Sequence, residues 1–317
     1  MYFCLGKLAI NDIDMNKDCI QKDARLLLSI LIPAYDYPEG VNKIIDQLKS
    51  LNSNQYEILV FDNSTDNRVK HVIEKKNQIA AYQITYQRNH RETGAVQNWN
   101  ALLDAAKGDF CLLMHHDEFP LGVDFVQRLL DTLVANSRTD VFMMDCILIS
   151  PTGNKARRHV PTWIRQKIVR YFPNYLFRRN VLGPISVLVV RRSLFPRFDE
   201  SLVWLVDVEL YVRLRTITNR WRICPELQIG SLLGRSDSIT ANIRSNINQL
   251  HMQELAYLDY KYPSAAMWVR SETGNYFRAL EATVWFAFRI VTRGFNPMLR
   301  ILGISPISLK NSQRTCK

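Results

Sequence analysis

The sequence lacks both glycine-rich motifs that commonly bind nucleotide phosphates through backbone amides. No Gly-x-Gly-x-x-Gly follows its first apolar run, and no Walker A sequence occurs along the 317 residues. If this chain binds a phosphorylated ligand, it has to do so through a metal ion or basic side chains. Its six cysteines include no Cys-x-x-Cys pair, which argues against a disulfide framework or a zinc ribbon and favours reduced thiols.

Long apolar segments are also absent. The most apolar late stretch, residues 282–291, is interrupted by Arg289 and is much shorter than the roughly 18 apolar residues of a spanning helix. The first residues of the chain acquire charges early, so we expect no signal peptide. Together with the reduced cysteines, these features predict a cytoplasmic protein that is at most peripheral on the inner face of the cell membrane.

Negative charge is scarce in two parts of the chain. The net charge is +11, and residues 151–192 hold ten Lys or Arg and no acid. Residues 261–317 are also basic, with nine Lys or Arg and two glutamates. Localised positive charge predicts an anionic partner and leaves three classes open: a nucleic acid, a phosphorylated small molecule or an anionic membrane surface. Solubility alone is the alternative explanation for either segment.

What the sequence does contain is an alternation of apolar runs and amphipathic segments. Residues 25–35 form a continuous apolar run of the kind that builds a buried parallel strand. Further strands are predicted at 56–62, 81–87, 109–114 and 139–150, with helices at 38–51, 66–78, 93–108 and 120–136. This alternation predicts an α/β fold with a mostly parallel sheet flanked by helices.

After residue 150 the pattern is less regular. We expect a strand within 180–195, a helix at 204–217, a returning strand at 221–234 and helices from about 245 onward. These changes divide the chain into an N-terminal leader at 1–25, a main α/β domain at 26–240 and a helical, basic C-terminal extension at 241–317.

Chemically active side chains gather where the predicted strands end. Tyr35 and Asp36 follow the first strand, Asp62 closes the second, and residues 115–118, His-His-Asp-Glu, follow the fourth. Ligands of open α/β sheets bind at the carboxyl ends of parallel strands. We therefore expect one site here, where a divalent cation held by Asp117 would neutralise a diphosphate. Each aspartate taken singly also fits a turn or a helix N-cap.

Four blocks of the sequence, taken in order, resemble glycosyltransferase family 2, whose members are inverting nucleotide-sugar transferases of the GT-A fold. The blocks are LSILIPAYDYPEGVNKIIDQL, EILVFDNSTD, RETGAVQNWNALLDAAKGDFCLLMHHDE and FDESLVWLVDVELYVRL, and the resemblance covers about residues 27–240. It implies a catalytic GT-A domain with a nucleotide site lined by Pro33, Ala34 and Tyr35. The resemblance also implies that Asp62 contacts the uracil or other base.

The third block carries the metal and nucleotide residues that the resemblance implies. The family's Asp-x-Asp element reads His-His-Asp-Glu here, so Asp117, helped by Glu118, would bind the metal. His115 stands at the position of the family's first aspartate, which commonly contacts the nucleotide ribose, so the resemblance implies that contact for His115. His116 and Asn100 would also lie at the nucleotide. Magnesium prefers oxygen ligands and manganese tolerates histidine, so we expect Mn²⁺ in preference to Mg²⁺.

Later residues complete the implied site. Asp207 matches the family's catalytic base and would take the proton of the acceptor hydroxyl. The same aspartate also fits a helix-start carboxylate favoured by the macrodipole. Arg235 stands near a position where many members carry a histidine, so either a metal ligand is lost here or the guanidinium replaces it and clamps the diphosphate. Trp204 is a further candidate for contacting the diphosphate or the acceptor.

The resemblance predicts transfer of a sugar from a nucleoside-diphosphate donor, most simply a UDP-sugar, to a hydroxyl of a saccharide or lipid-linked saccharide, with inversion. The expected setting is synthesis of a bacterial surface polysaccharide or lipopolysaccharide. The departures at His115 and Arg235 leave open a degenerate nucleotide-sugar-binding protein without turnover. The basic and aromatic residues 154–172 suggest a nucleic-acid-binding module. Because that segment lies inside an α/β enzyme pattern, we expect no nucleic acid partner.

The basic C-terminal region has two interpretations. Residues 276–302 combine an apolar stripe at helical spacing with four arginines. This pattern fits a helix docked on the main domain, or a helix that lies on an anionic membrane surface with its arginines facing the headgroups. The second interpretation would suit an acceptor carried on a lipid.

Overall fold

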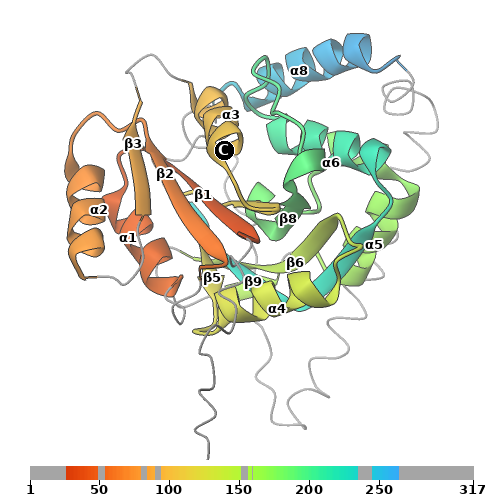
Figure 1. The fold of residues 1–317 in the computed structure, drawn as a ribbon. Helices are drawn as coiled ribbons and strands as arrows, with labels where there is room; N and C mark the ends of the chain where they lie inside the picture. The colour runs from red at the N-terminus through yellow and green to blue at the C-terminus, as the bar shows by residue number, and fades with distance from the viewer. Residues whose placement is uncertain are drawn as a thin grey trace, which may run out of the picture.

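The computed structural model describes residues 26–48, 54–79, 84–89, 94–150, 156–158, 160–234 and 245–263 (Figure 1). Its first half alternates strands and helices, as the apolar pattern predicts. The elements are β1 (Leu28–Ala34), α1 (Pro38–Gln47), β2 (Tyr56–Asp62), α2 (Arg68–Ile79), β3 (Ile84–Arg88), α3 (Ala95–Ala105) and β4 (Phe110–Leu113).

The second half is less regular. Its elements are β5 (Glu118–Leu121), α4 (Phe125–Ala135), β6 (Val141–Ile149), β7 (Ala156–Arg158), α5 (Thr162–Tyr171), β8 (Leu188–Arg191), α6 (Val206–Ile217), β9 (Trp221–Leu232) and α8 (Ile247–Lys261). The structure corrects the sequence prediction in two places. Pro120, expected to begin a helix, lies within strand β5, and α5 occupies a stretch for which we predicted no element.

The strands form one mixed sheet in the order β3-β2-β1-β4-β8-β6-β9-β5, with β7 paired to β6. Strand β1 is parallel to β2 and β4, and β2 is parallel to β3. Strand β8 is antiparallel to both of its neighbours, so β6 points the same way as β4, and β9 is parallel to β6. Most strands therefore end at one edge of the sheet. The predicted α/β fold with a mostly parallel sheet is confirmed.

Two apolar clusters pack on the two faces of this sheet. Because side chains alternate along a strand, Leu31 of β1 points into one cluster while Ile30 and Ile32 point into the other. Helices α3 and α6 contribute to the first cluster, and α1 and α4 contribute to the second. Each face of the sheet is thus covered by helices from both halves of the chain (Figure 1).

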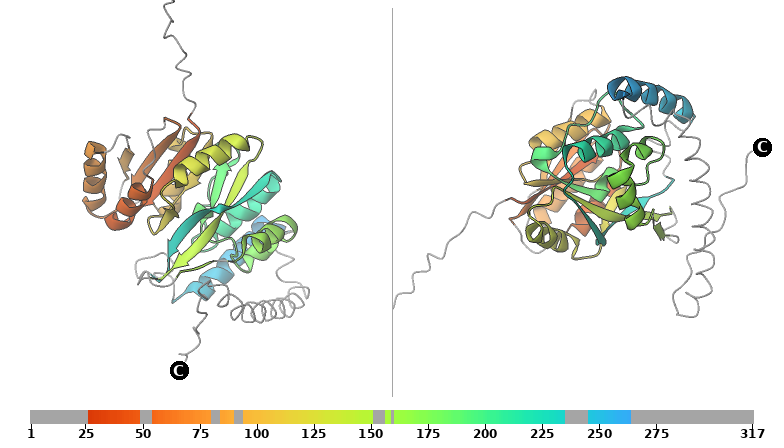
Figure 2. Two further views of the ribbon diagram at one scale, coloured as in Figure 1. Left: turned by 90° about the horizontal axis from the view of Figure 1, so that it is seen from below. Right: turned by 90° about the vertical axis from the view of Figure 1, so that its right-hand side faces the viewer.

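Helix α8 packs close to α6 (Figure 2), and its Leu258 belongs to the same apolar cluster as α6. Among the described residues, no helix combines the length and hydropathy needed to cross a bilayer. The leader at 1–25 and the amphipathic segment at 276–302 lie outside the described residues.

One arginine of the basic segment is a core residue. Arg165 of α5 and Asp145 of β6 are both fully buried, and the Arg165 Nη2 lies 2.8 Å from the Asp145 Oδ1. The Nη1 of Arg165 also donates to the Leu182 carbonyl at 3.0 Å. This guanidinium therefore joins a helix to the sheet and is not available to a nucleic acid.

Replacing Arg165 by Ala should lower the free energy of unfolding by about 3–5 kcal/mol, because it removes the cation that neutralises a buried carboxylate. Urea denaturation followed by circular dichroism measures the change. The control is Arg68→Ala, which removes an exposed pair with Asp66 and should cost less than about 1 kcal/mol. Equal effects of the two substitutions would contradict a structural role for the buried pair.

Candidate active site

The His-His-Asp-Glu segment forms a tight turn at the carboxyl end of β4. The chain is buried through Met114, and the Glu118 N–H then donates to the His115 carbonyl at 3.0 Å, which closes a β-turn. The Leu232 N–H donates to the Asp117 carbonyl at 3.1 Å and ties the turn to the end of β9. A buried strand thus ends in metal-capable side chains because the turn presents them at the edge where the parallel strands end.

His116 lies against α1, on the side of the first loop. Its ring centroid is 5.6 Å from that of Tyr37, in an edge-to-face arrangement. A Cβ on Gly40 of α1 would lie 2.0 Å from the His116 carbonyl oxygen, so a glycine is needed for this close approach. His116 therefore sits next to the loop that the sequence predicts to line the nucleotide.

His115 is enclosed by an aromatic ring and a carboxylate. Its ring centroid lies 4.7 Å from that of Trp99, and its Nδ1 lies 3.5 Å from the Oε1 of Glu118. The buried Glu118 also accepts the His115 backbone N–H at 3.1 Å. Burial alone lowers the His115 pKa, but the carboxylates of Glu118, Asp207 and Asp117 outweigh it and raise the pKa to about 9. In the absence of ligands, His115 is therefore mostly a cation at neutral pH.

Asp207 lies in the first turn of α6, as the sequence predicts. Its Oδ1 is buried and accepts no hydrogen bond from the described residues. Burial raises the pKa of Asp207 to about 6, reinforced by Glu118 and opposed by His115 and by the N–H of Ile185. A carboxyl group with this pKa is ionised at neutral pH and is suited to accept a proton from a substrate.

The turn offers a set of metal ligands. His115, Asp117 and Glu118 each present one ligand atom, and these atoms lie within 4.8 Å of one another. The Nε2 of His115 is buried and makes no hydrogen bond to the described residues. The other ring nitrogen, Nδ1, lies 3.5 Å from Glu118, which is itself one of the three candidate ligands. The residues present fit a divalent cation, with His115 joining the predicted ligands Asp117 and Glu118.

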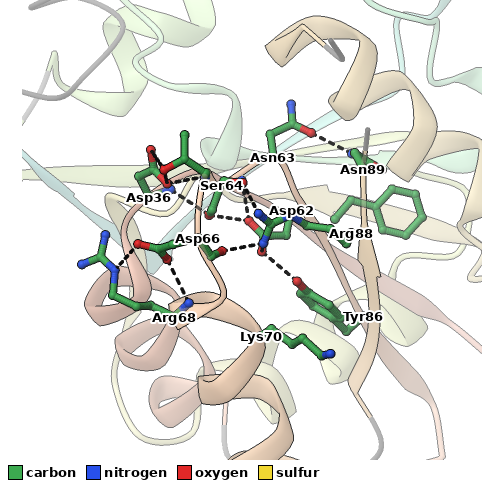
Figure 3. Close-up of polar contacts among 12 residues, drawn as sticks. Asp36, Asp62, Asn63, Ser64, Asp66, Arg68, Lys70, Tyr86, Arg88 and Asn89 are labelled. Carbon is green, nitrogen blue, oxygen red and sulfur yellow. Dashed lines mark hydrogen bonds and ion pairs between the residues drawn. The ribbon is translucent and has the colours of Figure 1, made fainter. Parts of the chain in front are cut away.

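Asp62 organises the loops that follow β2 and β3 (Figure 3). It is fully buried, and its Oδ1 accepts both the Ser64 N–H, at 2.8 Å, and the Ser64 hydroxyl. Its Oδ2 accepts the Tyr86 hydroxyl at 2.8 Å and the Nη1 of Arg88 at 3.2 Å. Both carboxylate oxygens of Asp62 are therefore hydrogen-bonded inside the protein. The cluster of Asp62, Ser64, Tyr86 and Arg88 forms one corner of the sheet.

The loop after β1 is tied to the same corner. Asp36 has a left-handed φ of 45°, and its N–H donates to the Ser64 hydroxyl at 2.8 Å (Figure 3). Pro33 and Ala34 are buried at the end of β1, whereas Tyr35 is 50% exposed. Of these three predicted nucleotide residues, Tyr35 thus presents the most side-chain surface to a ligand.

Asn100 lies away from this corner. Its buried side chain accepts the Phe198 N–H at 2.7 Å and donates to the Glu200 Oε1 at 3.0 Å, which joins α3 to the segment that precedes α6. Another asparagine of α3 reaches the corner instead. The Oδ1 of Asn98 accepts from the Nδ2 of Asn89 at 2.7 Å, next to the end of β3.

Glu254 of α8 holds the segment that leads into α6. This buried carboxylate accepts the N–H groups of Val203, Trp204 and Leu205 at distances of 2.7 to 3.1 Å. The indole N–H of Trp204 donates to the His251 Nδ1 at 3.2 Å. The residue before α6 provides no side-chain cap. A helix outside the predicted main domain therefore fixes the start of the helix that carries the candidate base.

Asp207 interacts electrostatically with His115 and Glu118, so the structure brings the predicted base to the turn that carries the predicted metal ligands. The loop predicted to line the nucleotide adjoins this turn through Tyr37 and His116. Glu254 holds the backbone of Trp204 just before α6. Arg235 lies outside the described residues.

Comparison with known proteins gives the family. The family profile described as Glycosyl transferase family 2 matches residues 29–198. Abequosyltransferase RfbV of Salmonella typhimurium is 22% identical over 256 residues, which cover 74% of this chain and 74% of that protein. An uncharacterized glycosyltransferase of Haemophilus influenzae is 28% identical over 92 residues, and the match covers 29% of this chain and 30% of that relative.

Solved structures share the fold. TarS residues 1–349 of S. aureus, in complex with UDP-GlcNAc, superposes with a TM-score of 0.53 at 15% identity, covering 68% of this chain and 61% of that one. The mannosyltransferase PcManGT from Pyrobaculum calidifontis, in complex with GDP-Man and Mn²⁺, gives 0.53 at 13% identity, covering 74% and 64%. The chain thus spans less than two thirds of these structures. At such identity the likeness shows the fold alone, a GT-A-like α/β fold.

Replacing Glu254 by Ala leaves three backbone N–H groups without their acceptor. The free energy of unfolding should therefore fall by at least about 2 kcal/mol. Glu254→Gln, which keeps one carbonyl acceptor, should fall between this variant and the parent. Chemical denaturation measures all three. Met252→Ala, at a position of the same helix that is 65% exposed, is the control and should stay within about 0.5 kcal/mol of the parent. Parent-like stability of Glu254→Ala would show that this contact does not hold the segment.

Proposed function

Because the chain belongs to glycosyl transferase family 2, we propose that it transfers a sugar from a nucleoside-diphosphate donor, most simply a UDP-sugar, to an acceptor hydroxyl with inversion. The observation that carries this proposal is the convergence of Asp207 and a metal-capable turn at the carboxyl edge of the sheet. The complexes of TarS with UDP-GlcNAc and of PcManGT with GDP-Man support a nucleotide sugar as the donor.

The acceptor is proposed from chemistry and from one relative. We assign a hydroxyl of a saccharide or lipid-linked saccharide, in the synthesis of a surface polysaccharide or lipopolysaccharide. The relative named an abequosyltransferase, itself a sugar transferase by its name, is in keeping with this class.

The reaction is a single displacement at the anomeric carbon. The acceptor oxygen forms a bond to that carbon, the bond to the diphosphate oxygen breaks, and Asp207 takes the acceptor proton. Attack from the face opposite the leaving group inverts the configuration. The pKa of about 6 keeps Asp207 ionised at neutral pH while leaving it a stronger base than an exposed aspartate.

A divalent cation would be held by Asp117 and Glu118, with the Nε2 of His115 available as a further ligand. When bound, it would neutralise the diphosphate and stabilise it as a leaving group. A histidine among the ligands favours Mn²⁺ over Mg²⁺. Because a ligating imidazole is neutral, cation binding would release the proton that the surrounding carboxylates hold on His115.

The nucleotide would lie over the loop after β1. Tyr35 is exposed and offers a ring for stacking on the base, with Pro33 and Ala34 as the wall behind it. Asp62, whose oxygens hold the adjacent loop, would shape the base pocket and contact its rim. His116, next to the same loop, would complete the pocket.

Nucleotide-sugar binding without turnover is the second candidate. The observation that favours it is the histidine at the first position of the Asp-x-Asp element, which changes the ligand set. Transfer of a labelled sugar, or hydrolysis of a nucleotide sugar that is lost with the base, distinguishes a catalyst from a binding protein. The nucleic-acid alternative is disfavoured by the burial of Arg165.

Replacing Asp117 by Ala should abolish the Mn²⁺-dependent part of UDP binding, because the remaining ligands hold the cation poorly. Isothermal titration calorimetry with and without Mn²⁺ measures it. The matched control is Asp124→Ala, which removes an exposed aspartate just beyond β5 and should bind UDP like the parent. If Asp117→Ala and the parent bind equally in both conditions, the metal assignment is wrong.

Replacing Asp207 by Asn should lower turnover by about 10²-fold or more while donor affinity changes little, because the amide cannot accept the proton. Burial raises the pKa of Asp207, so its ionised form destabilises the fold above the unfolded pKa, and the variant should keep or raise the parent Tm at pH 7.

The parent's kcat/KM should rise with pH through about 6 as Asp207 ionises. Steady-state kinetics and a pH profile measure these effects. If Asp207→Asn kept most of its activity, the base would lie elsewhere, with Glu200 the next carboxylate to test. Glu209 is less available because it is buried and paired with Arg213 and Lys261.

A further inference from the structure

Helix α5 presents an exposed face that mixes aromatic and basic side chains. Its residues recur at helical spacing on the side away from the core, and all are exposed: Trp163, Gln166, Lys167, Arg170 and Tyr171. Trp163 is 60% exposed and Tyr171 is 61% exposed, at opposite ends of the helix. The same helix buries Arg165 and Val169 in the protein, so its orientation is fixed.

Large exposed aromatics flanking cations are unusual on a surface that contacts only water. Residues 151–192 contain no acid, so the cations of α5 have no carboxylate within this segment of the chain. Trp and Tyr favour the region between water and lipid, where an apolar ring and a polar tip are both satisfied. Lys and Arg between such rings are the composition typical of a helix that lies on an anionic surface.

A cavity of about 300 Å³ lies beside this face. Its apolar lining includes Met143, Val169, Trp221 and Ile223. Two guanidinium-bearing residues from two helices also line it: Arg170 of α5 and Arg215 of α6. The third lining arginine, Arg222 of β9, alternates with Trp221 and Ile223, and its side chain contacts Cys224 on the other face of the sheet. No carboxylate is found among its lining residues in the described part of the chain.

The arginines are not all explained by contacts within the protein. Arg215 donates to the carbonyls of Val169 and Arg170, at 3.2 and 3.4 Å, and so caps the end of α5. Asp140, which precedes β6, accepts from Arg191 and Arg220 instead of from the cavity arginines. The two cations beside the cavity, Arg170 and Arg215, repel one another, and an anion placed between them would relieve that repulsion.

We propose that the α5 face and this cavity form a docking site for the anionic phospholipid surface of a membrane. The cavity takes one headgroup phosphate between Arg170 and Arg215, while Trp163 and Tyr171 enter the interfacial region. Two features point to the same occupant: the charge complements a phosphate, and the exposed rings suit lipid better than a free ion. The docking site uses none of the candidate active-site residues, so it stands whether or not the proposed transfer occurs.

Helix α5 lies at the edge of the molecule opposite α2 (Figure 1). A membrane bound to the α5 face would not cover the carboxyl edge of the sheet. If the proposed function holds, this docking would keep the enzyme at the surface that carries a lipid-linked acceptor.

The test is flotation of the full chain with vesicles of phosphatidylcholine alone or phosphatidylcholine mixed with phosphatidylglycerol, at low salt. The parent should float with the mixed vesicles and not with the neutral ones. Trp163→Ala combined with Tyr171→Ala, and separately Lys167→Glu combined with Arg170→Glu, should each lower the vesicle-bound fraction, the charge reversals by at least about tenfold.

Matched controls lie on other faces. Tyr260→Ala removes an aromatic ring that is 87% exposed on α8, and Lys75→Glu reverses an exposed charge on α2. Both should float like the parent. Circular dichroism and Tm establish that each variant is folded, and because two independent pairs are changed, failure of one pair to fold leaves the other to decide.

Three results would overturn the proposal. The parent could fail to float with either vesicle, or both α5 variants could float like the parent, which would place membrane binding elsewhere in the chain. Alternatively, inorganic phosphate could bind the parent in calorimetry, lose affinity in Lys167→Glu with Arg170→Glu, and abolish flotation at the same concentration. That outcome would assign the cavity to a free phosphorylated molecule.

Discussion

The site depends on holding the buried carboxylate of Glu118, the half-buried carboxylate of Asp207 and the His115 imidazole beside one another. Desolvation raises the pKa of Asp207 to about 6, and the carboxylates around His115 raise its pKa to about 9 despite burial. The positive charge of His115 and the negative charges of the carboxylates therefore stabilise each other. With an aspartate at position 115, the turn would gather carboxylates alone, and their repulsion would have to be relieved by a cation. The histidine balances charge in the absence of a metal. It also makes metal binding compete with a proton, so affinity for the cation should depend on pH.

The sheet supplies this arrangement through strands that are distant in sequence. Strand β4 delivers the turn, β5 reverses direction and pairs with the end of β9, and α6 brings Asp207 from the other half of the chain. The loops after β1 and β2 are joined to each other and to strand β3 through Asp62 and Ser64. Hydrogen bonds within this corner fix the loops before any nucleotide is present. A preorganised pocket of this kind loses less conformational entropy when the nucleotide binds.

Much of this fold could be predicted from the sequence because buried parallel strands leave continuous apolar runs, as at Leu28–Ala34. Strand β5 could not, because Pro120 reads as a helix start. Proline is tolerated there since β5 is the last strand of the sheet order and pairs with β9 alone. Arg165 was grouped with surface charge because its partner, Asp145, comes from a strand whose own pattern is apolar. The role of Glu254 could not be predicted from the sequence. Its carboxylate accepts backbone N–H groups, which every residue type except proline can supply, so no sequence pattern marks the contact.

The residues proposed to hold the donor and the residues that position the proposed base lie in different parts of the sequence. The family profile ends at residue 198, after the loops and the turn that would hold the donor and the cation. Asp207 and the residues that fix its helix come later, and Glu254 lies on α8 in the part of the sequence assigned to a separate extension. The matched profile thus includes the residues proposed to hold the donor and stops before α6 and α8. Because α8 touches both Trp204 and the start of α6, a change in that helix would act on the helix that carries the proposed base, and not on the loops proposed to hold the donor.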